Sequence, residues 1–521
     1  MRLPVALATR LTKSALTALF ATALLGLAFA QEPRHGGHLR VALSAVPPSL
    51  DQTFSTQESA FPVTFLIYEG LLGYDATDEI HPVLAESFEA NADNSSYTFV
   101  LRQGVRFHDG SEMTAADVVA SLERAKDLSP TRNRWGGIVD IVAVDDYTVR
   151  VDLDGPNAHW HRGLAWAPGQ AVIIPEAIAR DHMGEELTVF IGTGPYMLEE
   201  WVDDQYYTLA RFEDYVSPDG PGTYHVGPKH AYLDRITFTP VLDQAVRSLA
   251  LISGEFDLAD SLSADDYELL SEEPALDLIV VRPGDRTYLK LNPYQFPFDD
   301  PLIRRAAIAA LDPDEIMAAM GPEAFARVNT TPRWFPEQAQ WREQSDLYYP
   351  RDVELARRLL DASAYAGEEI RFLTRQDVPL SYITAVMVQE QMQDAGFNVT
   401  LVAVDGASFG AIRVDYTAYE IKTSGTGPVP FPTAISGHFN DRNGERWPWV
   451  HPEALYWFEV LSTTADEALL EYAMQQIHRL ELESNAQPWI GDIHGLRAAR
   501  TNVQDTPTQS VMVLWNTWLS D

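Results

Sequence analysis

The sequence predicts an α/β protein that divides into two or more lobes. Its 521 residues exceed what a single hydrophobic core usually organises. The clearest local topology is a βαβ unit, in which a strand at 370–374, a helix at 380–395 and an alternating strand at 397–404 follow one another. Helices are also predicted to begin at Asp300-Pro301 and Asp312-Pro313, because aspartate caps a helix and proline suits its first turn. Strands that alternate with helices in this way are typical of α/β folds.

Residues 97–124 carry the strongest local pattern of the chain. Apolar residues alternate with others from Tyr97 to Leu101, which predicts a strand with one face on a core. Asp109-Gly110 predicts a turn, and Thr114 three residues before Asp117 predicts the start of a helix. The expected apolar stripe of this helix consists of Val118, Leu122 and Ala125. The stretch is a packing module and contains no catalytic pattern.

Other elements are predicted from shorter signals. A helix at 244–253 should end at Gly254, and a strand is predicted at 288–292. The tail from 511 to 518 is expected to form a closing strand with Trp515 and Trp518.

Charge and cysteine content exclude several classes of function. The formal net charge is −37, and such a surface repels nucleic acid and anionic lipid, so neither is expected as a partner. Lysine is scarce, and the chain contains only Lys13, Lys126, Lys229, Lys290 and Lys422. Cysteine is absent, which excludes disulfides, thiolate nucleophiles, iron–sulfur clusters and cysteine-ligated zinc.

Residues 1–30 have the pattern of a secretory signal peptide. Three basic residues precede or flank an apolar run from Ala15 to Phe29, and Ala28-Phe29-Ala30 matches a cleavage site. A retained membrane anchor is the alternative, but the run is shorter than the roughly 20 residues that span a bilayer. Without a cysteine after the signal, no lipid anchor is expected. We therefore expect a protein free in the periplasm that begins near Gln31.

No catalytic motif, metal site or cofactor site is predicted. Gly192-Thr-Gly-Pro lacks the third glycine of a dinucleotide fingerprint and the lysine of a P-loop, so it is interpreted as a structural turn. His35 and His38 have a spacing that could hold a metal, but they lie beside flexible glycines and are expected to be solvated. Acid pairs such as Asp203-Asp204 are common in so acidic a chain. The protein is therefore not expected to be an enzyme.

Two segments are candidates for ligand contact. Arg375 and Gln376 follow a predicted parallel strand, and open α/β sheets bind ligands beyond the carboxyl ends of their strands. A surface salt bridge is the alternative role for Arg375. Residues 424–439 contain three prolines and three glycines, which predicts a shaped loop, and Trp447 and Trp449 follow it.

A series of motifs, in one order along the chain, resembles the family-5 solute-binding proteins of ABC importers. These motifs are Leu39-Arg-Val-Ala-Leu with Pro47-Pro-Ser-Leu-Asp51, Tyr68-Glu-Gly-Leu-Leu-Gly-Tyr, Pro82-Val-Leu-Ala-Glu-Ser, the 97–124 stretch, Gly192-Thr-Gly-Pro-Tyr, Leu233-Asp-Arg-Ile, Ser253-Gly-Glu-Phe-Asp, Leu291-Asn, Phe298-Asp-Asp-Pro-Leu-Ile-Arg-Arg-Ala, and Glu354 to Ala362 with Tyr365. They spread over nearly all of the chain after residue 30.

The resemblance implies a two-lobed periplasmic-binding-protein fold, type II-like, with an extra subdomain in the first lobe. The signal peptide would occupy residues 1–30. Lobe I would combine residues 31–285 with 487–521 and include a subdomain at about 54–189. Lobe II would span residues 286–486.

The same resemblance implies a receptor that captures a peptide-like solute between its lobes and delivers it to the permease subunits of an ABC transporter. An oligosaccharide or opine-type ligand is the alternative, and a secreted hydrolase is the alternative of another class. A monomer without a cofactor is expected. The residues expected to contact the ligand are Phe54, Arg375, Gln376, Thr426, Phe431 and Trp447.

This chain departs from the pattern of the peptide-binding members at one anchor. Those members carry an aspartate for the peptide amine in the loop that corresponds to residues 424–439, whereas this chain has no acid there before Asp441. A buried ammonium group without a partner is costly. Arg375 lies near the position of the arginine that pairs with a carboxylate in peptide binders.

Overall fold

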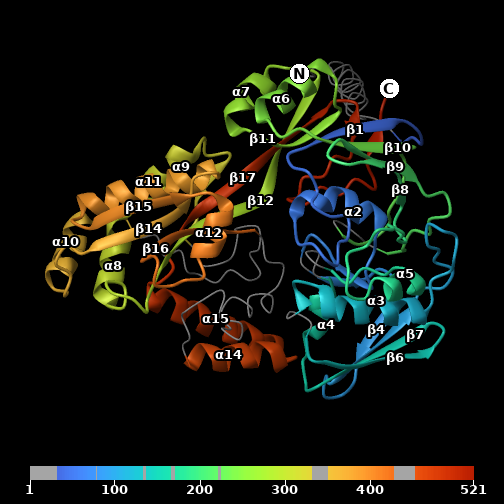
Figure 1. Ribbon diagram of the computed structural model, residues 1–521, viewed down its shortest axis with the longest axis horizontal. Helices are drawn as coiled ribbons and strands as arrows, with labels where there is room; N and C mark the ends of the chain where they lie inside the picture. The colour runs from blue at the N-terminus through green and yellow to red at the C-terminus, as the bar shows by residue number, and fades with distance from the viewer. Residues whose placement is uncertain are drawn as a thin grey trace, which may run out of the picture.

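One mixed sheet of eleven strands runs through both lobes of the protein (Figure 1). The computed structural model describes residues 32–77, 79–132, 136–165, 170–220, 225–330, 350–427 and 452–521. In spatial order the strands are β15 (Asn398–Val404), β14 (Glu369–Arg375), β16 (Ile421–Thr426), β12 (Leu276–Leu291), β17 (Trp489–Arg500), β11 (Leu258–Leu262), β1 (His38–Leu43), β10 (Arg235–Pro240), β9 (Tyr206–Arg211) and β8 (Tyr196–Val202), and β13 (Ala326–Val328) pairs with β17.

The long antiparallel strands β12 and β17 connect the two lobes. In Figure 1 they run diagonally from the left-hand lobe, which carries β14 to β16, to the right-hand lobe, which carries β1 and β10. Their register shifts between Val281 and Asp285, so the ladder is irregular where the chain passes between lobes. Gly284 lies in this irregular part, and a Cβ there would stand 2.1 Å from the carbonyl oxygen of Ile493. Only glycine allows the two strands to approach so closely at this point.

The second lobe contains the predicted βαβ unit. β14 and β15 pair in parallel and are connected by α11, which confirms the prediction. Asp300 and Asp312 cap their helices as predicted, accepting hydrogen bonds from the N–H groups of Leu302 and Glu315. The helices of this lobe are α8 (Pro301–Ala310), α9 (Pro313–Met320), α10 (Val353–Asp361), α11 (Pro379–Asp394), α12 (Gly406–Ile412), α14 (Pro452–Thr463) and α15 (Glu467–Ser484).

The first lobe is built around β1, which pairs in parallel with β10 and β11. The predicted helix at 244–253 is present as α6 (Gln244–Ser253), and Gly254 ends it with φ +78°. The other helical elements of this lobe are η1 (Glu58–Ala60), α2 (Phe61–Ile67), η3 (Ala264–Asp266) and α7 (Tyr267–Ser271).

A separate four-stranded antiparallel sheet with its own core lies below the first lobe in Figure 1. Its strand order is β4 (Ala85–Ala90), β5 (Ser96–Leu101), β7 (Thr148–Leu153) and β6 (Ile138–Asp145), with α3 (Ala115–Leu128), α4 (Trp160–Ala165) and α5 (Glu176–Asp181) beside it and the short pair β2 (Leu72–Tyr74) and β3 (Ile80–Pro82) nearby. The 97–124 stretch supplies β5 and α3. The predicted stripe of α3 is fully buried, and the Thr114 N–H donates to Asp117 Oδ2 at 2.8 Å, as the pattern predicted.

A buried ion pair joins two of the sequence motifs. Arg124, the last residue of the 97–124 stretch, lies 2.5 Å through Nη2 from Oδ2 of Asp51, the last residue of the Pro47–Asp51 run. Both side chains are buried, and Asp51 also accepts hydrogen bonds from the N–H groups of Thr53 and Leu187. The pair therefore fastens α3 to the loop that follows β1.

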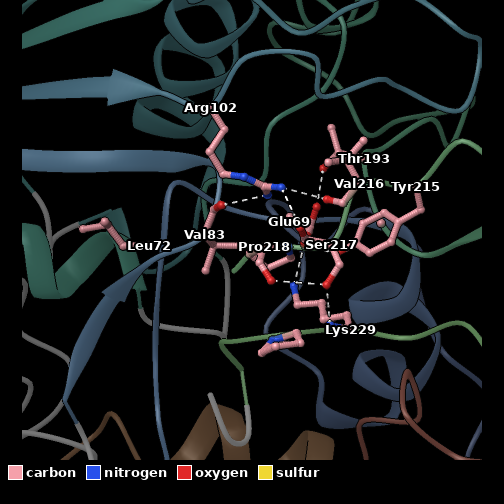
Figure 2. Close-up of polar contacts among 12 residues, drawn as sticks. Glu69, Leu72, Val83, Arg102, Thr193, Tyr215, Val216, Ser217, Pro218 and Lys229 are labelled. Carbon is pink, nitrogen blue, oxygen red and sulfur yellow. Dashed lines mark hydrogen bonds and ion pairs between the residues drawn. The ribbon is translucent and has the colours of Figure 1, made fainter. Parts of the chain in front are cut away.

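Glu69 forms a second buried network, shown in Figure 2. Its Oε1 accepts hydrogen bonds from Lys229 Nζ at 2.6 Å and from the Tyr215 hydroxyl at 2.9 Å, and its Oε2 accepts one from Thr193 Oγ1 at 3.0 Å. Lys229 Nζ also lies 4.6 Å from the centre of the Trp515 ring. Residues from four segments of the first lobe that are distant in the sequence therefore meet at the Glu69 carboxylate.

Gly192 and Gly194 form the structural turn that the sequence predicted. Cβ atoms on these glycines would lie 2.1 Å from the Ile67 carbonyl oxygen and 2.3 Å from that of Leu66, so the turn packs directly on the end of α2. The N–H of His108 donates to the Gly192 oxygen at 3.0 Å. The turn is occupied by protein and has a packing role.

The prediction of a closing strand at 511–518 is wrong. Residues 511–517 are irregular, and Trp518 belongs to the short strand β19 (Trp518–Leu519), which pairs with β18 (Val503–Gln504). Trp515 and Trp518 are both buried, and Trp515 packs in the core of the first lobe without belonging to a strand. No helix among the described residues is long and apolar enough to cross a membrane.

Breaking the Asp51–Arg124 pair should lower the free energy of unfolding strongly. Arg124→Met leaves a buried carboxylate without its cation, which typically costs about 3–5 kcal/mol. Arg150→Met, at the exposed pair with Asp152, is the matched control and should cost less than about 1 kcal/mol. Urea unfolding followed by tryptophan fluorescence measures both, and equal losses would contradict a structural role for the buried pair.

Stability should fall on mild acidification. Burial lowers the pKa of His108 and His159 to about 4 and that of His161 and His225 to about 3. Unfolded histidines titrate near 6.5, so below that pH the unfolded chain takes up protons that the folded chain does not, and the free energy of unfolding falls. The melting temperature should drop reversibly from pH 7.5 to 5.5, a window above the ordinary range of carboxylates. A constant melting temperature would contradict burial of these rings.

Candidate ligand-binding site

A cavity of about 580 Å³ lies where β12 and β16 meet the first lobe. Two smaller cavities in the described part of the chain hold only about 40 and 20 Å³. Sites for small solutes usually enclose a few hundred Å³ or more, so the large cavity is the candidate site. Its lining consists of Glu58, Asp285, Arg286, Thr287, Tyr288, Lys290, Arg375, Val378, Leu380, Ser381, Phe409, Arg413, Lys422, Thr423, Ser424, Gly425, Thr426, Gly427 and Ile493.

The central part of the lining is a ladder of side chains on β12 and β16. Three pairs of residues lie directly opposite one another in this antiparallel register, and directly opposed side chains share one face of a sheet. The pairs are Arg286 with Thr426, Tyr288 with Ser424, and Lys290 with Lys422. The strand that connects the lobes therefore also presents side chains to the cavity.

Positive charge is concentrated in this cavity although the chain as a whole carries −37. Five cationic residues line it against two acids, Glu58 and Asp285. Two of the five lysines of the entire sequence are among them. The cationic residues are Arg286, Lys290, Arg375, Arg413 and Lys422. Such a lining attracts a solute that carries negative charge.

Arg286 belongs to a buried network of polar side chains within the strands that connect the lobes. Its Nε donates to Asp492 Oδ1 at 2.9 Å, and both side chains are fully buried. Asp492 Oδ2 also accepts hydrogen bonds from Asn329 Nδ2 at 2.8 Å and from Arg327 Nε at 3.1 Å. Burial raises the pKa of Asp492, and the nearby Arg286 opposes that shift. This network joins β12, β13 and β17.

Arg375 lines the cavity and is at the same time part of an ion pair. Its Nε and Nη2 lie 3.1 and 2.8 Å from the two carboxylate oxygens of Asp377. This hydrogen bonding raises the pKa of Arg375. Both roles considered for Arg375 are thus compatible with its position, and contact with a ligand stays a prediction.

The other predicted contact residues are distributed unevenly. Thr426 lines the cavity, and its hydroxyl donates to the Gly427 oxygen at 3.1 Å. Gln376 continues the βαβ ladder through its N–H, which donates to the Val404 oxygen, and Phe54 is 42% exposed; neither is among the lining residues. Phe431 and Trp447 lie outside the described residues.

Sequence reasoning missed the two acids of the cavity. A Cβ on Gly427 would lie 3.6 Å from Asp285 Oδ1 and 3.9 Å from Glu58 Oε1, so both carboxylates converge on this glycine, one from β12 and one from η1. Removal of water by the surrounding protein raises the pKa of both groups, and repulsion from Asp285 raises that of Glu58 further. No local signal distinguished them in a chain with 75 acidic residues.

Sequence reasoning also missed Lys290, Lys422 and Arg413, although the lysines had a usable signal. Lysine is rare in this chain, and both residues fall in predicted or observed strands instead of exposed helices. Lys422 is only 8% exposed, and burial together with the nearby Arg413 lowers its pKa to about 8. It remains largely protonated at neutral pH.

The candidate metal-binding histidines do not come together. His38 Nε2 lies 2.8 Å from Thr237 Oγ1, whereas the His35 ring packs on Tyr232. Within the described ranges, Asp75, Glu79 and His81 form a group of possible ligands. The Asp75 carboxylate accepts hydrogen bonds from the N–H groups of Thr77 and Glu79, and it contacts His81 Nε2 at 3.0 Å. These bonds close the turn between β2 and β3.

The profile of the family described as bacterial extracellular solute-binding proteins, family 5 (middle region), matches residues 79–444. The chain belongs to this family. The glutathione-binding protein GsiB of Escherichia coli (strain K12) is 28% identical over 424 residues, which cover 78% of each chain. GsiB of Salmonella paratyphi A is 27% identical over 472 residues, which cover 86% of this chain and 87% of the relative. The sequence resemblance is therefore confirmed, and the protein is a solute-binding protein that works with an ABC transporter.

Solved structures confirm the two-lobed fold. The periplasmic binding protein AgaA from A. tumefaciens R10, in complex with agropinic acid, superposes with a TM-score of 0.77 at 24% identity and covers 93% of this chain and 99% of its own. DppA from Helicobacter pylori, in complex with the peptide STSA, gives a TM-score of 0.77 at 23% identity, covering 94% and 99%. At these identities the likeness concerns the fold alone.

A bulky side chain in the cavity should abolish ligand binding without unfolding the protein. Ser424→Trp places an indole ring among the lining residues, where it competes for the space that a solute needs. The rise in melting temperature that a bound solute causes in the wild type should disappear. Val144→Trp, at an exposed position of β6, is the control and should keep the rise. Binding that survives Ser424→Trp would place the ligand elsewhere.

Proposed function

We propose that this protein is a periplasmic receptor that captures a peptide-like solute in the cavity described above and delivers it to the permease subunits of an ABC importer. The observation that carries the proposal is the position of the cavity. Its central strand, β12, connects the lobes, and its lining includes Glu58 from the first lobe and β16 from the second. A solute bound there contacts both lobes and favours their closed arrangement.

The interlobe geometry supports closure as the consequence of binding. The lobes are connected through β12 and β17, whose ladder is irregular between Val281 and Asp285. They also meet away from these strands, where the Ala158 N–H of the subdomain donates to the Ser462 oxygen of α14 at 3.2 Å. The two connecting strands can act as a hinge, and the contact between the subdomain and α14 lies away from them. This arrangement is suited to opening and closing of the lobes.

The charges of the cavity support a ligand that carries both an acidic and a basic group. Glu58 and Asp285 offer carboxylates to an ammonium group although the loop after β16 has no acid before Asp441. The cationic residues offer partners to a carboxylate. GsiB is a glutathione-binding protein and DppA holds a peptide, and both of these ligands combine such groups, whereas AgaA holds agropinic acid, which also carries a carboxylate. An opine-type solute is the second candidate. A neutral oligosaccharide would offer no charged group to these residues.

Localisation and domain limits complete the proposal. Export would use residues 1–30, and the absence of cysteine supports a mature protein without a lipid anchor. Lobe I would comprise residues 31–285 and 487–521, and lobe II residues 286–486. The course of β12 and β17 supports these limits, because both strands pass between the lobes near them. The receptor would act as a monomer.

A solute panel tests the receptor function. Glutathione, the peptide Ser-Thr-Ser-Ala, a tryptic digest of casein, agropinic acid and maltotriose are added to the purified protein, and melting temperature and radius of gyration are measured. A receptor gains about 2.7 kcal/mol of stability at a hundredfold excess of ligand over Kd. At least one peptide-like solute should raise the melting temperature and reduce the radius of gyration. No response to any solute, together with turnover of a chromogenic hydrolase substrate, would contradict the proposal.

A further inference from the structure

Lys422 is a buried cation that has no acidic partner among the described residues. It lies on β16, lines the cavity and is 8% exposed. Its Nζ lies 5.6 Å from the centre of the Tyr419 ring, and the cationic Arg413 is close enough to influence its charge. Among the described residues no carboxylate lies within ion-pair distance of its Nζ. Burying a charge without a counter-charge lowers the stability of the folded protein. Packing alone therefore does not account for a lysine at this position.

The surroundings of Lys422 add positive charge. Lys290 lies directly opposite it in the β12–β16 ladder, and like charges in directly opposed positions destabilise a sheet. Arg413, just past the end of α12, lines the same cavity and makes no ion pair with a described acid. Three cationic residues thus share one part of the cavity in a protein that is acidic overall. A bound anion would offset the free-energy cost of burying the Lys422 charge, and it would also weaken the repulsion among the three cations.

We propose that Lys422 and Arg413 form a subsite that binds an anionic oxygen group of the solute, so that the physiological ligand is an acid with a carboxylate at this position. The inference rests on the proposed receptor function and specifies the chemical class of its ligand. It assigns the anion to Lys422 on β16 and to Arg413 just after α12 instead of to Arg375, because Arg375 is already neutralised by Asp377. Charge-assisted hydrogen bonds from ammonium and guanidinium groups suit this task.

Pairs of ligands that differ only in charge test this subsite. Ser-Thr-Ser-Ala is compared with its C-terminal amide, and glutathione with its diethyl ester, by titration calorimetry. At least one acid should bind about 10- to 100-fold more tightly than its neutral counterpart, the effect of losing one or two charge-assisted hydrogen bonds. Lys422→Met should remove this preference, and Lys422→Arg should retain it. Arg413→Gln tests the same subsite outside the buried strand position, in case Lys422→Met does not fold.

Lys126→Met is the matched control. It removes one lysine from the exposed surface of α3 and should leave both affinity and preference unchanged. The melting temperature of ligand-free Lys422→Met should equal or exceed that of the wild type, because the substitution removes a buried charge. A purely structural lysine would give the opposite result, a lower melting temperature with unchanged preference for acids, and that would overturn the inference.

The remaining outcomes separate this inference from the receptor function. Equal affinity for acid and neutral forms, or binding of maltotriose alone, would overturn the anion subsite and leave a receptor. Failure of every solute to bind, together with turnover of the chromogenic hydrolase substrate, would overturn the receptor function itself.

Discussion

The cross-strand pair of Arg286 and Asp492 is the interaction on which lobes and cavity both depend. The two residues oppose each other on β12 and β17, the strands that connect the lobes, and both side chains are fully buried. A buried ion pair is not a large source of stability, but separating its members is costly, so it holds the register beside the irregular ladder at 281–285. Arg286 also belongs to the strand that carries Tyr288 and Lys290 into the cavity. Motion of the lobes and geometry of the site are therefore coupled through one strand.

The motifs that identify the family stabilise the fold and do not line the candidate ligand-binding cavity. Asp51 pairs with Arg124, Glu69 holds Lys229, and His108 supports the turn at Gly192. None of these residues lines the large cavity. The motifs therefore predict the fold of this chain, and the residues that line the cavity lie outside them. The ligand of a relative can suggest a class of solute, but the class that this protein binds depends on the charged residues of its own cavity.

Local signals predicted the elements that depend on local physics. Capping and periodicity located α3, α6 and the βαβ unit because those signals act within a few residues. The strand at 288–292 was predicted far too short, since Pro283-Gly284 usually ends a strand, and only its pairing with β17 extends β12 to sixteen residues. Apolar residues suggested a strand at 511–518, although burial alone explains them. Glu58, Asp285 and Lys422 could not be predicted as cavity residues, because they lie on η1, β12 and β16, which are far apart in the sequence and meet only in the folded protein.

We infer that this chain combines the fold of its family with a cavity selective for an acidic solute. The most direct measurement is mass spectrometry of small molecules released from protein purified without denaturation from the periplasm of its own organism. We expect a stoichiometric solute that bears at least one carboxylate and that is absent from Lys422→Met protein prepared in parallel. Recovery of a neutral oligosaccharide, or of the same acid in equal amount from both proteins, would contradict selectivity for an acidic solute through Lys422.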